Sequence, residues 1–139
     1  LEHVRRPEEV LGEMTRVVRP GGHLWLSYTN WYGPWGGHET SPWHFFGGDF
    51  AARRYSARTG RVPKNRYGES LFVLHVGSLL RHVAAEPRLE VLDARPRYLP
   101  NALRGVVRVP VVRELCTWNL EVLARRRSID VTAPAEDLE

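Results

Sequence analysis

Cysteine is nearly absent from this sequence, and its scarcity limits the chemistry that the chain can perform. Cys116 is the only cysteine among 139 residues. Neither an internal disulfide framework nor a zinc site built from several thiolates can therefore form within the chain. A single thiol is typical of proteins in a reducing compartment, so we expect a cytoplasmic protein.

Long apolar runs are also missing. No stretch approaches the roughly 20 apolar residues that are needed to cross a bilayer, and the residues from Leu1 onward show no signal-peptide pattern. Hydrophobic residues make up 42% of the chain and charged residues 26%, a balance that indicates a folded globular domain. We expect no membrane span.

Lysine is the third scarcity, since Lys64 is the only lysine among 20 basic residues. The net charge of +4 is therefore supplied by arginine. These arginines are scattered along the chain, apart from a run at Arg125-Arg126-Arg127. A nucleic-acid-binding domain usually gathers its basic residues into one patch or stripe, so we expect no nucleic-acid partner.

The clearest regular segment lies between residues 7 and 29. Pro7 suits the first turn of a helix, where the acidic Glu8 and Glu9 complement the helix dipole. Apolar residues then recur at helical spacing until Pro20-Gly21-Gly22 ends the helix. The aromatic and aliphatic residues 23–29 predict a strand. A helix, a glycine turn and a strand form half of a βαβ unit, which indicates an α/β fold.

Further elements are expected downstream, separated by irregular regions. They are a short helix over 49–60 with Asp49 as its N-cap, a helix over 69–87, and strands over 88–99 and 116–126. Pro110 breaks any long helix in the mixed region before the last strand. So few strands make a poor independent sheet. We therefore expect the second half of a larger α/β domain.

The first 30 residues, LEHVRRPEEVLGEMTRVVRPGGHLWLSYTN, carry a family resemblance. The Leu1-Glu2-His3-Val4 step, Pro7 and the turn RVVRPGG at 16–22 occur in an order and spacing that resemble class I S-adenosylmethionine-dependent methyltransferases, from the end of strand four through strand five. Only Val18 departs, at a position usually held by leucine. The resemblance covers roughly residues 1–125, and the stretch SYTNWYGPWGGHE is similar to uncharacterised actinobacterial members of the family.

This resemblance implies a Rossmann-like sheet to which the chain contributes strands five, six and seven, with flanking helices and a long aromatic insertion. Strand seven of the family is antiparallel and lies between strands five and six. The implied domain covers residues 1–127, with an acceptor-side insertion or lid at 30–69, and a polar tail follows at 128–139. The family's glycine-rich cofactor loop and ribose-binding acidic residue fall outside this chain. We therefore expect it to supply mainly the acceptor-side half, to be inactive alone, and to pair with the missing N-terminal half or with another copy.

The expected site lies beyond the carboxyl ends of the strands, where open α/β sheets bind ligands. By its place in the resemblance, His3 is expected to contact S-adenosylmethionine and to line the catalytic site. The expected substrate-binding residues are Tyr28, Asn30, Trp31, Trp35 and His44. Most of them belong to a loop that runs from Trp31 to Phe46 and that we call the aromatic loop. This loop would suit an apolar acceptor pocket or lid. Alternatively, its rings form a small second core under the loop.

The histidines of this loop have three interpretations. As a general base, either His38 or His44 could deprotonate an acceptor hydroxyl, because histidine titrates near working pH, and His38 is our candidate catalytic residue. As metal ligands, His38, Glu39, His44 and Asp49 offer suitable atoms, but their spacing matches no tight zinc pattern, so we expect no metal. The third interpretation is a set of hydrogen bonds that hold the loop in place.

The function expected from these features is methyl transfer from S-adenosylmethionine to a small, partly apolar or lipid-like acceptor. A non-catalytic binding or oligomerisation module with the same fold is the main alternative. A metal-dependent hydrolase built on the histidine-containing loop is a further one.

Overall fold

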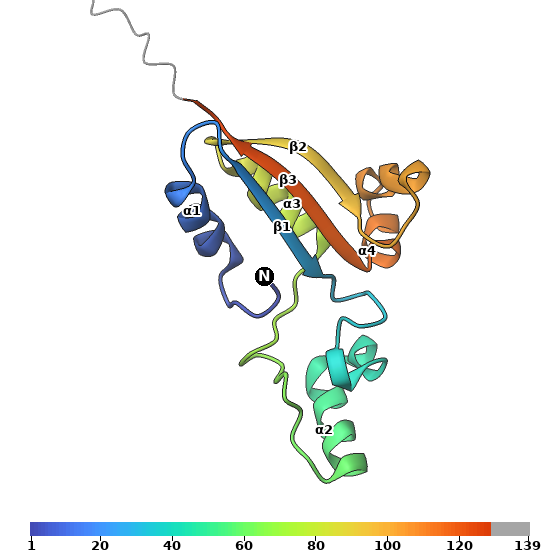
Figure 1. Ribbon diagram of the computed structural model, residues 1–139. Helices are drawn as coiled ribbons and strands as arrows, with labels where there is room; N and C mark the ends of the chain where they lie inside the picture. The colour runs from blue at the N-terminus through green and yellow to red at the C-terminus, as the bar shows by residue number, and fades with distance from the viewer. Residues whose placement is uncertain (129–139) are drawn as a thin grey trace, which may run out of the picture.

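A three-stranded antiparallel sheet forms the centre of the computed structural model, which describes residues 1–128 (Figure 1). Its strands are β1 (His23–Thr29), β2 (Leu89–Pro96) and β3 (Asn119–Arg126), arranged in the order β1-β3-β2. β3 is antiparallel to both neighbours. β1 and β2 therefore run in the same direction, and their carboxyl ends meet at one edge of the sheet. We call this edge the carboxyl edge.

Helices lie beside the sheet and beyond its carboxyl edge. In the described part of the chain they are α1 (Pro7–Val17), α2 (Gly48–Thr59), α3 (Val76–Ala85), α4 (Val112–Cys116) and the 3₁₀ helices η1 (His38–Thr40), η2 (Trp43–Phe46) and η3 (Asn101–Arg108). Figure 1 shows α1 beside β1 and α3 against one face of the sheet. It also shows α2 and its neighbouring turns projecting away from the sheet beyond the end of β1.

The hydrophobic core lies between α3 and one face of the sheet. Because side chains alternate across a strand, β1 and β3 each send every second residue to this face. The buried residues include Leu24, Leu26 and Tyr28 of β1, Leu120, Val122 and Ala124 of β3, and Leu79 and Val83 of α3, and Leu11 of α1 belongs to the same cluster. On the opposite face, Trp25 remains 56% exposed.

The first two elements confirm the sequence prediction. The helix begins at Pro7 and the strand spans 23–29, as the spacing of apolar residues and the glycine turn indicated. Gly21 has a φ of +75° in this turn, a left-handed conformation that glycine adopts without steric strain. The α/β class is therefore confirmed.

The predicted helix over 69–87 is wrong in its first part, since α3 begins only at Val76. Residues 69 and 70 lie in a turn, and residues 72–75 form no helix, where backbone groups bond distant parts of the chain. The Phe72 N–H donates to the Glu2 carbonyl at 2.8 Å, and the Leu74 carbonyl accepts from the Trp31 N–H at 3.3 Å. Leu71 and Leu74 are buried as expected, although they do not lie on a helix.

Further element boundaries differ from the prediction, among them that of β2, which ends at Pro96 rather than 99. The N-cap of α2 is Gly47, with a φ of +108°, and Asp49 lies inside the first turn. The last strand begins at Asn119 rather than 116, because α4 occupies the residues up to Cys116. The predicted end of α2 at Gly60 is confirmed by its left-handed φ of +68°.

The predicted polar tail at 128–139 lies outside the described residues except for its first position. Within residues 1–128, no helix is long and apolar enough to span a bilayer.

Candidate active site

The carboxyl edge gathers the predicted site residues because several chain segments end there. Thr29, the last residue of β1, lies opposite Asn119, the first residue of β3. The Asn30 N–H then donates to the Trp118 carbonyl at 3.0 Å, and the Arg97 N–H donates to the Asn119 carbonyl at 2.9 Å. The aromatic loop therefore leaves the sheet beside the ends of β2 and β3.

His3 and His38 come together at this edge, although 34 positions separate them in the sequence. Their rings stack with centroids 5.0 Å apart and an interplanar angle of 24°. The exposed His3 ring is held by Nδ1, which lies 2.7 Å from the Ser70 carbonyl oxygen. Because a carbonyl oxygen only accepts, Nδ1 carries the proton, and Nε2 of a neutral ring is left with a free lone pair.

His38 is half-buried, and its Nε2 is buried without a hydrogen-bond partner among the described residues. Its backbone has a φ of +49°, which is uncommon for a residue other than glycine. Burial lowers the pKa of His38 below its ordinary value, and His3 lowers it further, against the opposing effect of the carboxylates of Glu2 and Glu39. A neutral ring at this position is able to accept a proton.

Glu2 completes a group that could hold a metal ion. One ligand atom each from Glu2, His3 and His38 lies within 4.8 Å of the others. The Glu2 carboxylate is held in place by the Thr29 N–H, which donates to it at 3.2 Å. Two imidazoles and a carboxylate suit divalent transition metals. The prediction that the site uses no metal stays a prediction.

The alternative metal set considered from sequence is not assembled in the described part of the chain, where only the Glu2, His3 and His38 group meets. Glu39 instead binds Asn65, accepting from its backbone N–H at 2.7 Å and from its side-chain amide at 2.8 Å. This contact joins the aromatic loop to the segment after α2.

Trp31 and His44 form the buried base of the aromatic loop. Trp31 is 7% exposed and His44 is fully buried, and their rings meet edge to face with centroids 5.3 Å apart. The Nε2 of His44 lies 3.2 Å from the Gly33 carbonyl, to which it donates, and its Nδ1 is buried without a partner in the described chain. Both residues thus hold the loop together, as the small-core interpretation expects.

Trp35 has the opposite environment. It is 54% exposed, and it meets Trp118 and Tyr98 edge to face, with ring centroids 5.6 and 5.9 Å away. Each strand end thus contributes one ring: Trp35 follows β1, Tyr98 follows β2 and Trp118 precedes β3. We call these three side chains the aromatic platform. It is open to solvent and able to receive an apolar ligand.

Tyr28 and Asn30 lie beneath this surface. Tyr28 is 2% exposed, and burial above all, followed by the charges of Glu114 and Glu2, raises the pKa of its hydroxyl far above the ordinary value. The side-chain amide of the fully buried Asn30 donates to the Glu114 carbonyl at 2.6 Å. Their predicted contact with substrate stays a prediction, since both are covered in this conformation.

Sequence reasoning missed Glu2, Ser70, Tyr98 and Trp118 as members of this region. Glu2 was visible in the Leu-Glu-His-Val step. The two aromatic residues lie near the ends of the predicted strands 88–99 and 116–126, but only the order of the strands shows that they meet Trp35.

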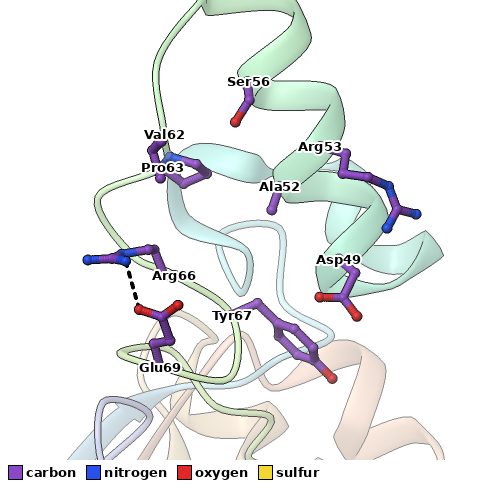
Figure 2. Close-up of a pocket in the computed structure, with 9 residues that line it drawn as sticks. All are labelled: Asp49, Ala52, Arg53, Ser56, Val62, Pro63, Arg66, Tyr67 and Glu69. Carbon is purple, nitrogen blue, oxygen red and sulfur yellow. Dashed lines mark ion pairs between the residues drawn. The ribbon is translucent and has the colours of Figure 1, made fainter.

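A separate hollow of about 380 Å³ lies between α2 and the extended segment that follows it. Figure 2 shows Asp49 and Arg53 on the α2 side and Pro63 and Tyr67 on the other. Tyr67 links this hollow to the loop, because its ring centroid lies 5.5 Å from that of Trp31.

No family model matches the chain. Curated relatives of the chain include mycobacterial proteins named "Uncharacterized methyltransferase". The protein from Mycolicibacterium vanbaalenii is 46% identical over 124 residues, which are 89% of this chain and 48% of the relative. Those from Mycolicibacterium gilvum and Mycobacteroides abscessus are 47% and 44% identical, over 89% and 91% of this chain and 48% of each relative.

The chain thus spans about half the length of the curated relatives that it matches. Their names and organisms confirm the predicted resemblance to a methyltransferase of an actinobacterial group.

Proposed function

We propose that this chain, whose relatives are named methyltransferases, is the acceptor-side half of a domain that transfers a methyl group from S-adenosylmethionine. The observation that carries the proposal is the identity of 44–47% to those relatives over about nine tenths of the chain. The acceptor is a small, partly apolar compound. The exposed free thiol of Cys116 suits a cytoplasmic protein.

In this proposal β1, β2 and β3 are strands five, six and seven of a Rossmann-like sheet. The strand order supports it, because β3 is antiparallel and lies between β1 and β2. The outer edge of β1 has no strand beside it in the described residues. An unpaired edge favours the addition of a strand, which agrees with pairing to a missing N-terminal half or to a second copy.

The aromatic platform is our proposed acceptor surface. Trp35, Tyr98 and Trp118 are each more than a third exposed, so stacking an apolar ring or chain on them removes apolar area from water. The platform lies at the carboxyl edge, where the His3 and His38 pair also lies. Binding on the platform would orient the acceptor relative to these rings.

His38 is our proposed general base, because its half-buried ring carries a nitrogen that bonds nothing in the described chain. Its Nε2 is covered in this conformation, so it would have to be uncovered to accept the proton that an acceptor hydroxyl loses as its oxygen is methylated. His3 would hold the neighbouring ring by stacking, with its own orientation fixed by the Ser70 carbonyl.

The residues present fit one side of a cofactor site. The exposed His3 ring, whose Nδ1 bonds the Ser70 carbonyl, would contact S-adenosylmethionine, which supplies an electrophilic methyl group when bound. The glycine-rich loop of the family lies outside this chain, so we propose that the chain alone is inactive.

Calorimetric titration with S-adenosylhomocysteine tests the proposal. One titration uses the chain of 139 residues. A second uses the extended chain, which is the same chain together with the upstream residues of its own reading frame. Binding by the extended protein alone is the expected result. If neither protein binds, the methyltransferase assignment fails and a non-catalytic module becomes the better account.

A further inference from the structure

An exposed group of aromatic side chains lies at the junction of η2 and α2. Phe46 is 72% exposed and Phe50 is 40% exposed. The ring centroids of Phe46 and Phe50 are 6.1 Å apart. The ring centroid of Trp43 lies 6.2 Å from that of Phe46 and 6.5 Å from that of Phe50. We call these three residues the aromatic tip. Large apolar side chains gathered in water usually mark an interaction surface.

Three arginines of α2 adjoin the aromatic tip. The Arg54 guanidinium lies over the Trp43 ring, 3.8 Å from its centroid. Arg53, Arg54 and Arg58 line a hollow of about 530 Å³ together with Phe50. None of the three arginines forms an ion pair or a side-chain hydrogen bond with any residue in the described range 1–128. Unpaired guanidinium groups beside exposed rings indicate a partner that is both anionic and apolar.

The aromatic tip belongs to η2 and the first turn of α2, and Figure 1 shows α2 beyond the end of β1, away from the sheet. The sheet has two outer edges among the described residues, those of β1 and β2, and the one that we assign to domain pairing is the outer side of β1. A strand added there would extend the sheet sideways and would not by itself cover the tip. The tip is therefore a second surface, separate from the edge that we assign to domain pairing.

A bilayer with anionic lipids matches both halves of this surface. Aromatic rings settle at the boundary between headgroups and acyl chains, and basic residues are attracted to the negative headgroups. Guanidinium groups bind phosphate in a two-pronged geometry. An acidic protein or a nucleic acid would satisfy the arginines, but it would need a shaped apolar pocket or an unstacked base to receive the rings, whereas a bilayer offers phosphate and hydrocarbon side by side.

We propose that the aromatic tip and its three arginines dock this chain onto the surface of a bilayer that contains anionic phospholipids. The rings of Phe46 and Phe50 enter the headgroup boundary, and the arginines contact the phosphates. This docking is independent of the proposed methyl transfer, and its test does not measure activity.

The test is co-sedimentation with vesicles of phosphatidylcholine alone and of phosphatidylcholine mixed with phosphatidylglycerol. The chain of 139 residues and the extended chain are both tested. We expect binding to the anionic vesicles that weakens as salt is added. Phe46→Ser should lower the partition coefficient by about tenfold, and Arg53→Gln with Arg58→Gln should lower it by about thirtyfold at low salt.

Matched controls come from η3, which also carries exposed apolar and basic residues. Leu103→Ser removes an exposed apolar side chain, and Arg104→Gln with Arg108→Gln removes two charges. Neither control should change the partition coefficient by more than about twofold, if the tip is the docking surface. Far-ultraviolet circular dichroism checks that every variant is folded.

Three results would overturn the proposal. One is the absence of sedimentation with anionic vesicles, and another is an equal loss of binding in the tip variants and the η3 controls. The third is binding by the chain of 139 residues but not by the extended chain, which would mean that upstream residues cover the aromatic tip. One further outcome would identify a different partner. If no protein binds vesicles and Phe46→Ser converts a dimer to a monomer in gel filtration, the aromatic tip binds a second copy of the chain.

Discussion

Buried polar atoms without partners distinguish the carboxyl edge at the scale of single residues. In the described chain these include the Tyr28 hydroxyl, the Asn30 amide oxygen, and one ring nitrogen each of His38 and His44. An unsatisfied buried polar group costs about 1–3 kcal/mol. Their concentration in one region suits a site whose conformation serves binding more than stability.

His44 gives the first prediction. Burial lowers its pKa, against the opposing effect of the Gly33 and Trp31 carbonyls. The folded state therefore takes up a proton less readily than the unfolded chain does, and stability should fall as pH drops below the unfolded value of about 6.5. His44→Gln should show a smaller decrease in melting temperature than the wild type between about pH 7.5 and 5.

The comparison uses the slope of melting temperature against pH, because the substitution also changes packing. His23→Gln, at the exposed start of β1, should keep the wild-type slope. Equal slopes in all three proteins would show that His44 does not contribute.

His38 gives the second prediction, which rests on the proposed function. In the extended protein, His38→Asn should lower kcat by about 10²–10⁴-fold with little change in KM, because a positioned base acts on the reacting proton. His23→Asn serves as the matched control. An unchanged kcat would remove His38 from the catalytic role and leave it to hold the loop.

At the scale of elements, α3 depends on a carboxylate from α4. The Glu114 side chain accepts the N–H groups of Val76 at 2.9 Å and Gly77 at 2.8 Å, in the first turn of α3. The α3 N-cap residue, His75, contributes no side-chain capping bond. A Cβ at Gly77 would meet the ends of the Arg113 and Glu114 side chains, so a larger residue there would displace the carboxylate that caps α3.

The third prediction follows from this contact. Glu114→Ala should lower the free energy of unfolding by about 1–2 kcal/mol, because it removes both capping bonds and a charge that complements the helix dipole. Urea denaturation measures the change. Glu69→Ala, which breaks the exposed ion pair with Arg66, should cost less than about 0.5 kcal/mol. Equal losses would show that Glu114 does not act as a cap.

At the scale of the whole molecule, stability depends on β3, because this last strand joins β1 to β2. Leu120, Val122 and Ala124 of β3 are fully buried against α3 and the neighbouring strands. The last strand in the sequence is therefore the central strand of the sheet. A domain with one small sheet has little stability to spare.

The fourth prediction tests this central position. Leu120→Ala should lower the free energy of unfolding by about 2–5 kcal/mol, through lost burial and the cavity left behind. Leu115→Ala, at a side chain that is 57% exposed, should change it by no more than about 0.5 kcal/mol. The midpoint of urea denaturation gives both values. Similar effects would contradict a core centred on β3.

Local signals predicted α1 and β1 almost residue for residue. Pro7, the helical spacing and the glycine turn act within a few residues of one another, so no distant contact is needed to interpret them. The helix over 69–87 was placed less well, because its first part bonds to Glu2 and Trp31. Such backbone contacts override local preference and leave no periodic signal.

The sequence by itself determined the α/β class, the expectation of a strand at each of three places, and the resemblance that the relatives confirm. Only the tertiary structure decided that His3 stacks on His38, that Trp35 meets Tyr98 and Trp118, and that Trp31 and His44 are buried together. The physical reason is the order of the strands. Inserting β3 between β1 and β2 brings three strand ends to one edge, and residues far apart in the chain become neighbours there.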